Sequence, residues 1–299
     1  MSHALPLSSA LSPLPSVSAA DAEMARIAAV DAHGVHLRAL ESLAGCHACV
    51  GLQMEIWGAA FTDIVPASML QVAGHVGGIL VGAYSGDSLI GFVFGLTGVK
   101  HDEIVHWSHM LGVRRDAREM GVGRRLKEYQ RAMLASRGIA REFWTFDPLQ
   151  AKNAHLNINR LGVRVIDYVV DMYGSMGSPL HFGVPTDRLI VECSTGARGR
   201  VSPVTGPAAA AVAQTPILTP FMQPGDPGAQ GESPGIVRIE VPGDVEFVPP
   251  ETLSQWRLGT RTHFQWAFLR GYRVVGLMRD PASSRAFYVL ARDGHRMDA

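Results

Sequence analysis

The feature that most constrains this 299-residue chain is a strand–turn–helix pattern between Ile104 and Gly138. Residues 104–113 are predicted to form a strand covered on both faces, because both alternating sets of side chains are largely apolar. At the junction with the helix lies an R-x-x-G-x-G string, formed by Arg118, Glu119, Met120, Gly121, Val122 and Gly123. Its glycines let a ligand reach the backbone, and the free N–H groups of the first helical turn attract anions. The string therefore predicts a phosphate-binding turn.

This turn and the sequence around it resemble the GNAT superfamily of N-acetyltransferases. The string is similar to the superfamily's acetyl-CoA-binding motif, Q/R-x-x-G-x-G/A after a β-strand. Three longer runs, W-S-H-M-L-G-V from Trp107, W-T-F-D-P-L-Q-A-K-N from Trp144 and P-T-D-R-L-I-V-E-C from Pro185, resemble a bacterial branch of predicted acetyltransferases. The similarity spans roughly residues 35–193. A lone string of this kind matches many loops by chance, so the order of the elements around it carries the weight.

The resemblance implies a mixed α/β fold, the GNAT acyl-CoA N-acyltransferase fold, in which an α+β mixed sheet joins an antiparallel meander to a splayed parallel strand pair. The hydrophobic pattern agrees with that order. We expect strands at residues 35–38, 79–84, 89–96, 104–113, 141–147, 164–173 and 188–193, and helices at residues 40–58, 66–74, 122–137 and 150–161.

Composition divides the chain into four parts. Residues 1–25 are predicted to be a disordered leader, and residues 26–194 the GNAT acetyltransferase domain. Residues 195–235 are rich in Pro, Gly and Ala, which predicts a linker or a long excursion. Residues 236–299 return to apolar strand and helix patterns and form a C-terminal α/β extension.

A weak internal similarity connects this extension to the domain before it. The run G-V-R-V-I from Gly162 resembles G-Y-R-V-V from Gly271, and each follows a predicted helix. One interpretation is that the extension is a degenerate half of the same fold. The other is that a glycine followed by a β-branched strand is simply how helices hand over to strands.

The resemblance implies that acetyl-CoA, as cosubstrate, lies on the turn and on the strand before it. The pyrophosphate would lie on the backbone of the turn and the pantetheine along the strand. The expected cofactor-binding residues are Met110, Leu111, Gly112, Val113, Arg118, Glu119, Met120, Gly121, Val122, Gly123, Arg124 and Asn153. Candidates for contact with the adenosine phosphates are Arg114, Arg115, Arg124 and Arg125.

Acyl transfer to an amine needs a base for the ammonium, donors for the oxyanion and an acid for the departing thiolate. In the superfamily the acid is usually a tyrosine four residues before the glycine that ends the second helix. That position is Ile158 in this chain. Tyr173 is the first substitute, and Tyr168 or a water molecule is the alternative.

For the general base, His109, Glu55 and Asp147 are candidates. The unperturbed pKa of histidine, about 6.5, suits proton removal by His109 at neutral pH. His106 and His109 are three residues apart on a strand, so they face opposite sides and cannot share a metal. The structural alternatives are a satisfied core position for either histidine and a turn or cap role for Asp147.

The sequence thus predicts an N-acetyltransferase that moves an acetyl group from acetyl-CoA to an amine of a small molecule or peptide by direct transfer in a ternary complex. The alternative is a catalytically inactive acyl-CoA-binding regulatory module, which Ile158 favours. No metal is expected, because Cys46 and Cys49 form a lone C-x-x-C without a second ligand pair. Together with Cys193 they are expected to be buried thiols in a reducing cytoplasm.

Composition also bears on the partners. The formal net charge is 0, which argues against broad electrostatic binding of nucleic acid. No apolar run approaches the roughly 18 residues of a membrane span, so no membrane partner is expected. The expected partners are acetyl-CoA and an unidentified amine acceptor. Proteins of the superfamily are often dimers, so a homodimer stays open.

Overall fold

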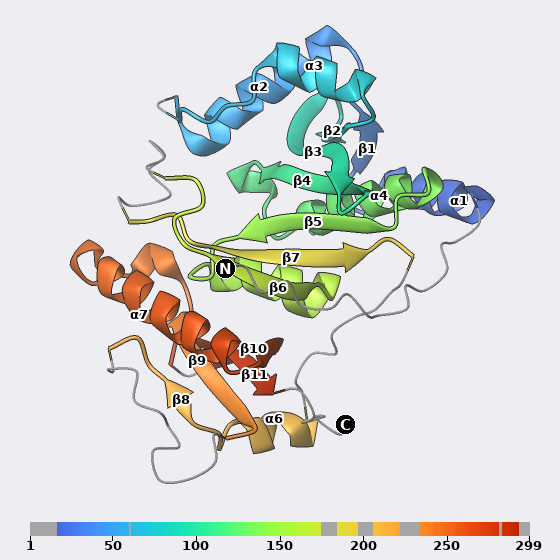
Figure 1. The fold of residues 1–299 in the computed structure, drawn as a ribbon. Helices are drawn as coiled ribbons and strands as arrows, with labels where there is room; N and C mark the ends of the chain where they lie inside the picture. The colour runs from blue at the N-terminus through green and yellow to red at the C-terminus, as the bar shows by residue number, and fades with distance from the viewer. Residues whose placement is uncertain are drawn as a thin grey trace.

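The computed structural model describes residues 17–59, 61–174, 184–196, 206–221, 234–280 and 283–292. Within this part of the chain the strands form a seven-stranded and a four-stranded sheet (Figure 1). The larger sheet comes from the first two thirds of the chain and the smaller one from the last third. The mixed α/β class expected from the sequence is confirmed.

The larger sheet consists of β1 Val35–Ala39, β2 Ile79–Ser85, β3 Ser88–Lys100, β4 Glu103–Val113, β5 Arg141–Phe146, β6 Arg164–Val169 and β7 Arg188–Ser194. Its strand order is β1-β2-β3-β4-β5-β7-β6. The first four strands form an antiparallel meander, whereas β4 and β5 are parallel. The helix α4 (Val122–Ser136) supplies the crossover that parallel neighbours require.

Helices cover both faces of this sheet. On one face, α2 (Leu43–Trp57) and α3 (Ala67–His75) pack against side chains of β2 and β3. On the other face, α1 (Val17–Ala28) and α4 pack against the meander. Because α4 follows β4 in a crossover, its N-terminus lies at the carboxyl end of that strand, where open α/β sheets bind ligands.

The disordered leader predicted over residues 1–25 is ordered in the part that the structure describes. Residues 1–16 lie outside the described residues, and residues 17–25 are helical as part of α1. Arg125 of α4 donates to the carbonyls of Ile27 and Ala29 at the end of α1. It also pairs with Asp31. The Arg125 side chain thus satisfies carbonyl groups that the end of a helix leaves without an intrahelical donor. The composition of residues 1–25 does not reveal this contact, because Arg125 lies far along the sequence.

The second helix of the domain departs from α geometry. It begins as α5 (Ala151–Ala154), continues as a π-helical stretch, η2 (His155–Leu161), and ends at Gly162 with φ 68°. Such π-turns are frequent at functional sites. The strand expected up to residue 173 is shorter than predicted, since β6 ends at Val169.

The C-terminal unit consists of α6 Gly206–Val212, β8 Ile217–Leu218, β9 Ile236–Pro242, the short helix η4 Val245–Phe247, α7 Pro250–Leu269, β10 Tyr272–Asp280 and β11 Arg285–Arg292. Its sheet has the order β10-β11-β9-β8. The linker predicted over residues 195–235 therefore contains α6 and β8, and β8 pairs with β9. Residues 197–205 and 222–233 of that linker lie outside the described residues.

This unit repeats the second half of the larger sheet. β5 runs parallel to β4, and β9 runs parallel to β8. A helix follows β5 and β9, and after one more strand, β7 pairs antiparallel with β5 and β6, as β11 does with β9 and β10. Both helices end at a left-handed glycine, Gly162 or Gly271. The next strand is bulged at the same distance from that glycine, after Val165 and after Val274. The C-terminal unit thus has the strand order and connections of the second half of the larger sheet, which is what the half-repeat interpretation of the sequence expects.

The two halves share one apolar cluster. Phe264 of α7 stacks on Tyr168 of β6 with ring centroids 5.3 Å apart, and it meets Tyr288 edge-on at 5.0 Å. The side-chain amide of Asn159 in η2 donates to the carbonyl of Leu277 at 2.8 Å and accepts from its N–H at 3.3 Å. The C-terminal unit is thus packed onto the ends of β5, β6 and β7 (Figure 1).

Candidate functional site

The slot between β4 and β5 is the centre of the candidate site. Within the described residues these strands pair only through His106 with Glu142 and Trp107 with Phe143. Farther along they are no longer paired with each other, although β4 stays paired with β3 and β5 with β7. This is the splay that the resemblance implied. Its strand edges offer backbone groups to an extended ligand, as in β-strand addition.

A β-bulge lies at the start of the slot. Phe94 pairs with Met110 and Gly95 with Ser108, so His109 is the extra residue in β4. The His109 side chain is exposed, and its ring lies edge-on to Phe94 with centroids 6.2 Å apart. Met110 packs on the same cluster, beside α2 and α3. The bulge therefore places two successive side chains, those of His109 and Met110, on the face of the sheet away from α4.

The R-x-x-G-x-G string lies at the strand-to-helix junction, as its pattern predicted. Gly121 is the N-cap of α4 with φ 77°, a left-handed conformation that other residues adopt only with strain. No side chain in the described part of the chain caps this helix end. The N–H groups of residues 122–124 thus have no cap, and the helix dipole adds a positive potential. A Cβ at Gly123 would lie 3.7 Å from side-chain atoms of Leu111 and Val113, ordinary contact, so protein packing tolerates alanine there.

The arginines of the turn differ in their availability. Arg114 makes two hydrogen bonds to Asp116, at 2.7 and 3.0 Å, and Arg124 pairs with Glu128 at 2.8 Å. Arg125 is not available for the adenosine phosphates, because it closes the end of α1. The structure thereby corrects that expectation. The Arg118 side chain is exposed, and among the described residues its one hydrogen bond is to the carbonyl of Val113, at 3.4 Å.

A pocket of about 640 Å³ lies at this turn. It is lined by Glu55, Ile56, Arg114, Arg115, Asp116, Arg118 and Glu246. Glu246 belongs to η4 of the C-terminal half, which therefore contributes to the wall of the pocket. Next to it, Asp244 forms an ion pair of 2.8 Å with Lys152, in the first turn of α5. Sequence reasoning missed Glu246 and Asp244, because no motif marks them and only the packing of the two halves brings them here.

Tyr173 and His109 flank the slot on one face of the sheet. The Tyr173 hydroxyl lies 3.1 Å from Oγ1 of Thr145 in β5. Because His106 and Glu142 pair in parallel register, Thr145 and His109 project from the same face, away from α4. Desolvation lowers the pKa of His109 from its ordinary value, and the carboxylate of Asp63 opposes that shift. A neutral imidazole at neutral pH is the form that accepts a proton.

Two other candidates are engaged in structural contacts. Asp147 accepts hydrogen bonds from Arg257 at 2.9 and 2.7 Å, and Arg188 lies 3.7 Å away. Burial alone would raise the pKa of Asp147, but these arginines hold it below its usual value. Tyr168 donates to Asp187 at 2.6 Å, and burial together with this bond raises the pKa of its hydroxyl. These contacts leave Asp147 unsuited as a base and Tyr168 unsuited as an acid.

The asparagines of the second helix have polar roles. Asn157 is buried, and its Oδ1 accepts a hydrogen bond of 2.7 Å from the indole N–H of Trp144 in β5. Its amide donates to Oδ1 and to the carbonyl of Asn153, at 3.0 and 2.8 Å. Asn153 is exposed at the first turn of α5. Ile158, at the usual tyrosine position, is 1% exposed and belongs to the core.

A buried polar cluster lies under the point where β4 and β5 separate. Lys127 of α4 pairs with Glu142 of β5 and lies 3.7 Å from the centroid of the Trp144 ring. Its ammonium also donates to Oε1 of Gln130, at 2.9 Å. Gln130 in turn contacts Nε2 of His106 at 3.1 Å. Buried charges of this kind are costly unless paired and hydrogen-bonded.

The contacts of His106 define its neutral state. Thr97 uses its hydroxyl proton toward the carbonyl of Gly77, so Nδ1 of His106 must donate to Thr97. Nε2 then accepts from the amide of Gln130. Burial lowers the pKa of His106 to about 3, and the charges of Lys127 and Arg137 act in the same direction.

Because of His106, the free energy of unfolding is therefore expected to decrease as the pH is lowered. Between pH 6.5 and pH 3, His106 binds a proton in the unfolded chain but not in the folded protein. Its contribution to stability is therefore fully present above the unfolded pKa and is lost progressively as the pH falls toward the folded pKa. From pH 7 to pH 5 we expect a loss of about 2 kcal/mol beyond that of the His106→Gln variant, whose side chain does not titrate. Denaturant titrations of both proteins at the two pH values measure it. Equal losses would contradict the neutral assignment.

The cysteines and the helices add two observations. Cys46, Cys49 and Cys193 are buried free thiols, and burial raises the pKa of Cys49 to about 12. Among the described residues, no three His, Cys, Asp or Glu side chains gather in a way that could hold a metal ion. None of the helices in the same part of the chain combines the length and the apolar character needed to cross a membrane.

Comparisons with known proteins add a likeness in fold. No protein-family model and no curated protein matches the chain. Among solved structures, the ribosomal-protein-S18-alanine N-acetyltransferase from Escherichia coli is 18% identical, with a TM-score of 0.41 over 55% of this chain and 96% of its own. Aminoglycoside 6′-acetyltransferase type Ii is 18% identical, with a TM-score of 0.43 over 55% of this chain and 98% of its own. Arabidopsis thaliana NAA60 in complex with acetyl-CoA is 13% identical, with a TM-score of 0.43 over 54% of this chain and 99% of its own.

These identities and TM-scores are too low to carry a residue role or a substrate over to this chain. The fold rests instead on its own topology: an antiparallel meander, a parallel β4–β5 pair that separates after two residues, and a crossover helix that starts at the glycine string. Residues 35–194 thus have the GNAT fold, to which the C-terminal half-repeat is an addition.

Proposed function

We propose that this chain is an N-acetyltransferase that moves the acetyl group of acetyl-CoA directly to an amine of a small molecule or peptide. One observation carries the proposal: the uncapped N-terminus of α4, with a left-handed glycine at its cap, lies at the end of the strand that borders the open slot. A helix end of this kind suits a diphosphate, and a separated strand edge suits the amide-containing arm that follows it.

In this proposal the cofactor runs from the turn into the slot. The diphosphate lies on the N–H groups of residues 122–124, with Arg118 as a further cation. The pantetheine pairs with the edge of β4 at residues 110–113, across from Asn153 of α5. Acetyl-CoA is the cosubstrate, and the acceptor amine enters from the face that carries His109.

The chemistry then needs three groups at the slot. His109 accepts the proton of the incoming ammonium as general base. Backbone N–H groups of β4 near the bulge hold the oxyanion of the tetrahedral intermediate. The hydroxyl of Tyr173 gives its proton to the thiolate of CoA as the carbon–sulfur bond breaks, and the acetyl group remains on the amine.

Replacing Tyr173 with phenylalanine or His109 with alanine is expected to lower the turnover number at saturating acetyl-CoA by ~10² each. The affinity for CoA should not change, because neither side chain contacts the phosphate turn in the proposal. Release of the CoA thiol, followed with a panel of amines, measures turnover. Matched controls are Tyr129→Phe on α4 and His75→Ala at the end of α3, which should keep wild-type rates. An unchanged rate for either test variant would remove that residue from the mechanism.

The second candidate function is an acyl-CoA-binding regulatory module without catalysis. The buried Ile158 favours it, because the usual proton donor is absent and the position cannot reach solvent. The C-terminal half-repeat would then report occupancy to a partner. Acetyl-CoA binding without thiol release for any amine in the panel would support this reading over the first.

A further inference from the structure

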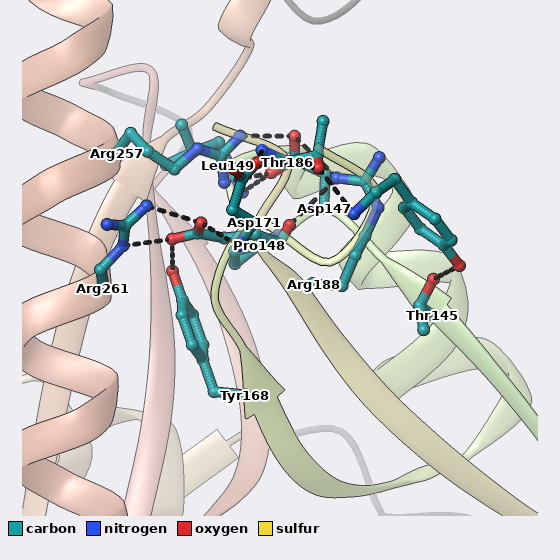
Figure 2. A network of polar contacts seen from close by, with 12 residues as sticks. Thr145, Asp147, Pro148, Leu149, Tyr168, Asp171, Thr186, Arg188, Arg257 and Arg261 are labelled. Atoms are coloured by element: carbon teal, nitrogen blue, oxygen red, sulfur yellow. Dashed lines mark hydrogen bonds and ion pairs between the residues drawn. The ribbon is translucent and has the colours of Figure 1, made fainter. Parts of the chain in front are cut away.

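Two arginines on one face of α7 reach into the strand ends beside the slot (Figure 2). Arg257 donates to both carboxylate oxygens of Asp147, at 2.9 and 2.7 Å. One helical turn later, Arg261 donates to both oxygens of Asp187, at 2.9 and 2.8 Å. Paired bonds of this kind fix direction as well as distance. The C-terminal half therefore makes two oriented contacts with the GNAT domain.

The two carboxylates lie at neighbouring strand ends. Asp147 follows the last residue of β5 and Asp187 precedes the first of β7, and these strands pair through Phe146 and Leu189. Arg257 is 2% exposed and Asp187 is fully buried. Burial would raise the pKa of each carboxyl group, but the arginine contacts hold both below the usual value. Both aspartates are therefore charged, and α7 neutralises them.

From Asp147 one set of contacts leads to Tyr173. Arg188 lies 3.7 Å from Asp147 and places its guanidinium 5.3 Å from the centroid of the Tyr173 ring. A cation over an aromatic face is attracted to it. Removing Arg257 would leave Arg188 as the remaining arginine partner of the partly buried Asp147 carboxylate, which would draw Arg188 away from the ring.

From Asp187 a second set of contacts leads to the backbone of the same tyrosine. Asp187 accepts the N–H of Asp171 at 3.0 Å. Asp171 accepts the N–H of Thr186 at 2.9 Å, and the hydroxyl oxygen of Thr186 accepts the N–H of Tyr173 at 3.0 Å. The backbone and the ring of Tyr173 are thus held by two separate paths, and each begins at an arginine of α7.

We propose that Arg257 and Arg261 are positioning residues, through which the C-terminal half-repeat holds Tyr173 against the slot. The importance of this placement for catalysis rests on the proposed function; the placement itself does not. Neither arginine touches the slot, and both act through the aspartates. The half-repeat carries no R-x-x-G-x-G string of its own, so its contribution to the site lies in these contacts and in the pocket wall at Glu246.

Hydrogen–deuterium exchange tests the placement without any assay of activity. Arg257→Met and Arg261→Met in the full chain are expected to raise exchange by about tenfold or more in peptides covering residues 168–174 and 184–190. The matched control is Arg285→Met, which removes an equally close paired contact, 2.7 Å to each oxygen of Glu240, within the C-terminal sheet. It should leave those peptides unchanged. Unchanged exchange in both test variants would overturn the proposal.

Kinetics tests the catalytic part. For Arg261→Met, whose side chain is 20% exposed and whose loss the fold tolerates better than that of the buried Arg257, we expect kcat to fall about tenfold or more. The KM for acetyl-CoA and the affinity for CoA should stay at wild-type values. Arg261→Lys should recover only part of kcat, because lysine cannot make the paired contact. An equal rise in KM with unchanged kcat would contradict positioning. A wild type that transfers no acetyl group would refute the proposed function, and the exchange result would still decide the placement.

Discussion

Gly121→Glu is expected to abolish measurable binding of acetyl-CoA and of CoA. The new carboxylate would lie at the uncapped end of α4, where the proposal places the diphosphate. Two like charges about 4 Å apart at a partly exposed site repel by about 4 kcal/mol, or about 10³ in affinity. Isothermal titration of the purified protein with both ligands measures the change.

Two controls separate charge from backbone strain in this experiment. Gly138→Glu adds the same carboxylate at the opposite end of α4, at a glycine with φ 72° and open space around it. It should bind like the wild type. Gly121→Ala introduces the left-handed strain, about 1 kcal/mol, without charge, and should weaken binding by about tenfold or less. A wild type that does not bind would refute the acyltransferase proposal, and Gly121→Glu binding normally would place the diphosphate elsewhere.

Lys127→Met is expected to lower the free energy of unfolding by about 3–5 kcal/mol. The methionine keeps contact with the ring of Trp144, but the carboxylate of Glu142 is left buried without its cation. One oxygen of that carboxylate, Oε2, already has no hydrogen-bond partner among the residues that the structure describes. Since a domain is typically stable by about 5–15 kcal/mol, this single change removes a large part of the total. Denaturant titration measures it.

A double variant tests the reason for this loss. Lys127→Met combined with Glu142→Met removes both charges and should recover most of the stability, because an apolar pair is often as stable as a buried ion pair. Lys152→Met breaks the ion pair with Asp244. Because the Lys152 side chain is 60% exposed, this change should lower the free energy of unfolding by about 1 kcal/mol or less. A double variant no more stable than Lys127→Met would show that packing, and not the unpaired charge, causes the loss.

The order of elements in the GNAT domain was predictable because each element carries its own hydrophobic period. The strand over residues 104–113 and the helix that begins at Val122 were predicted close to their observed bounds. The half-repeat was less visible. It left two similar five-residue runs, which start at Gly162 and at Gly271, whereas the shared strand pairing and bulge positions appear only in the structure.

Predictions failed where a partner lies far along the chain. The leader over residues 17–25 is helical because it packs on α4 and because Arg125 closes its end. Asp147 accepts the N–H of Leu149 at 2.8 Å, as a turn aspartate does, but its carboxylate is also paired with Arg257, 110 residues later, and that pairing was not predicted. No local pattern encodes such a partner.

The sequence by itself determined the strand, the glycine string and the helix after it, since periodicity and backbone freedom are properties of neighbouring residues. It also determined the α/β class. The tertiary structure decided the separation of β4 from β5 after two pairs, the bulge at His109, the cluster around Lys127 and the contacts of α7 with two strand ends. These features depend on which distant side chains share buried space, and burial is what makes their charges and hydrogen bonds decisive.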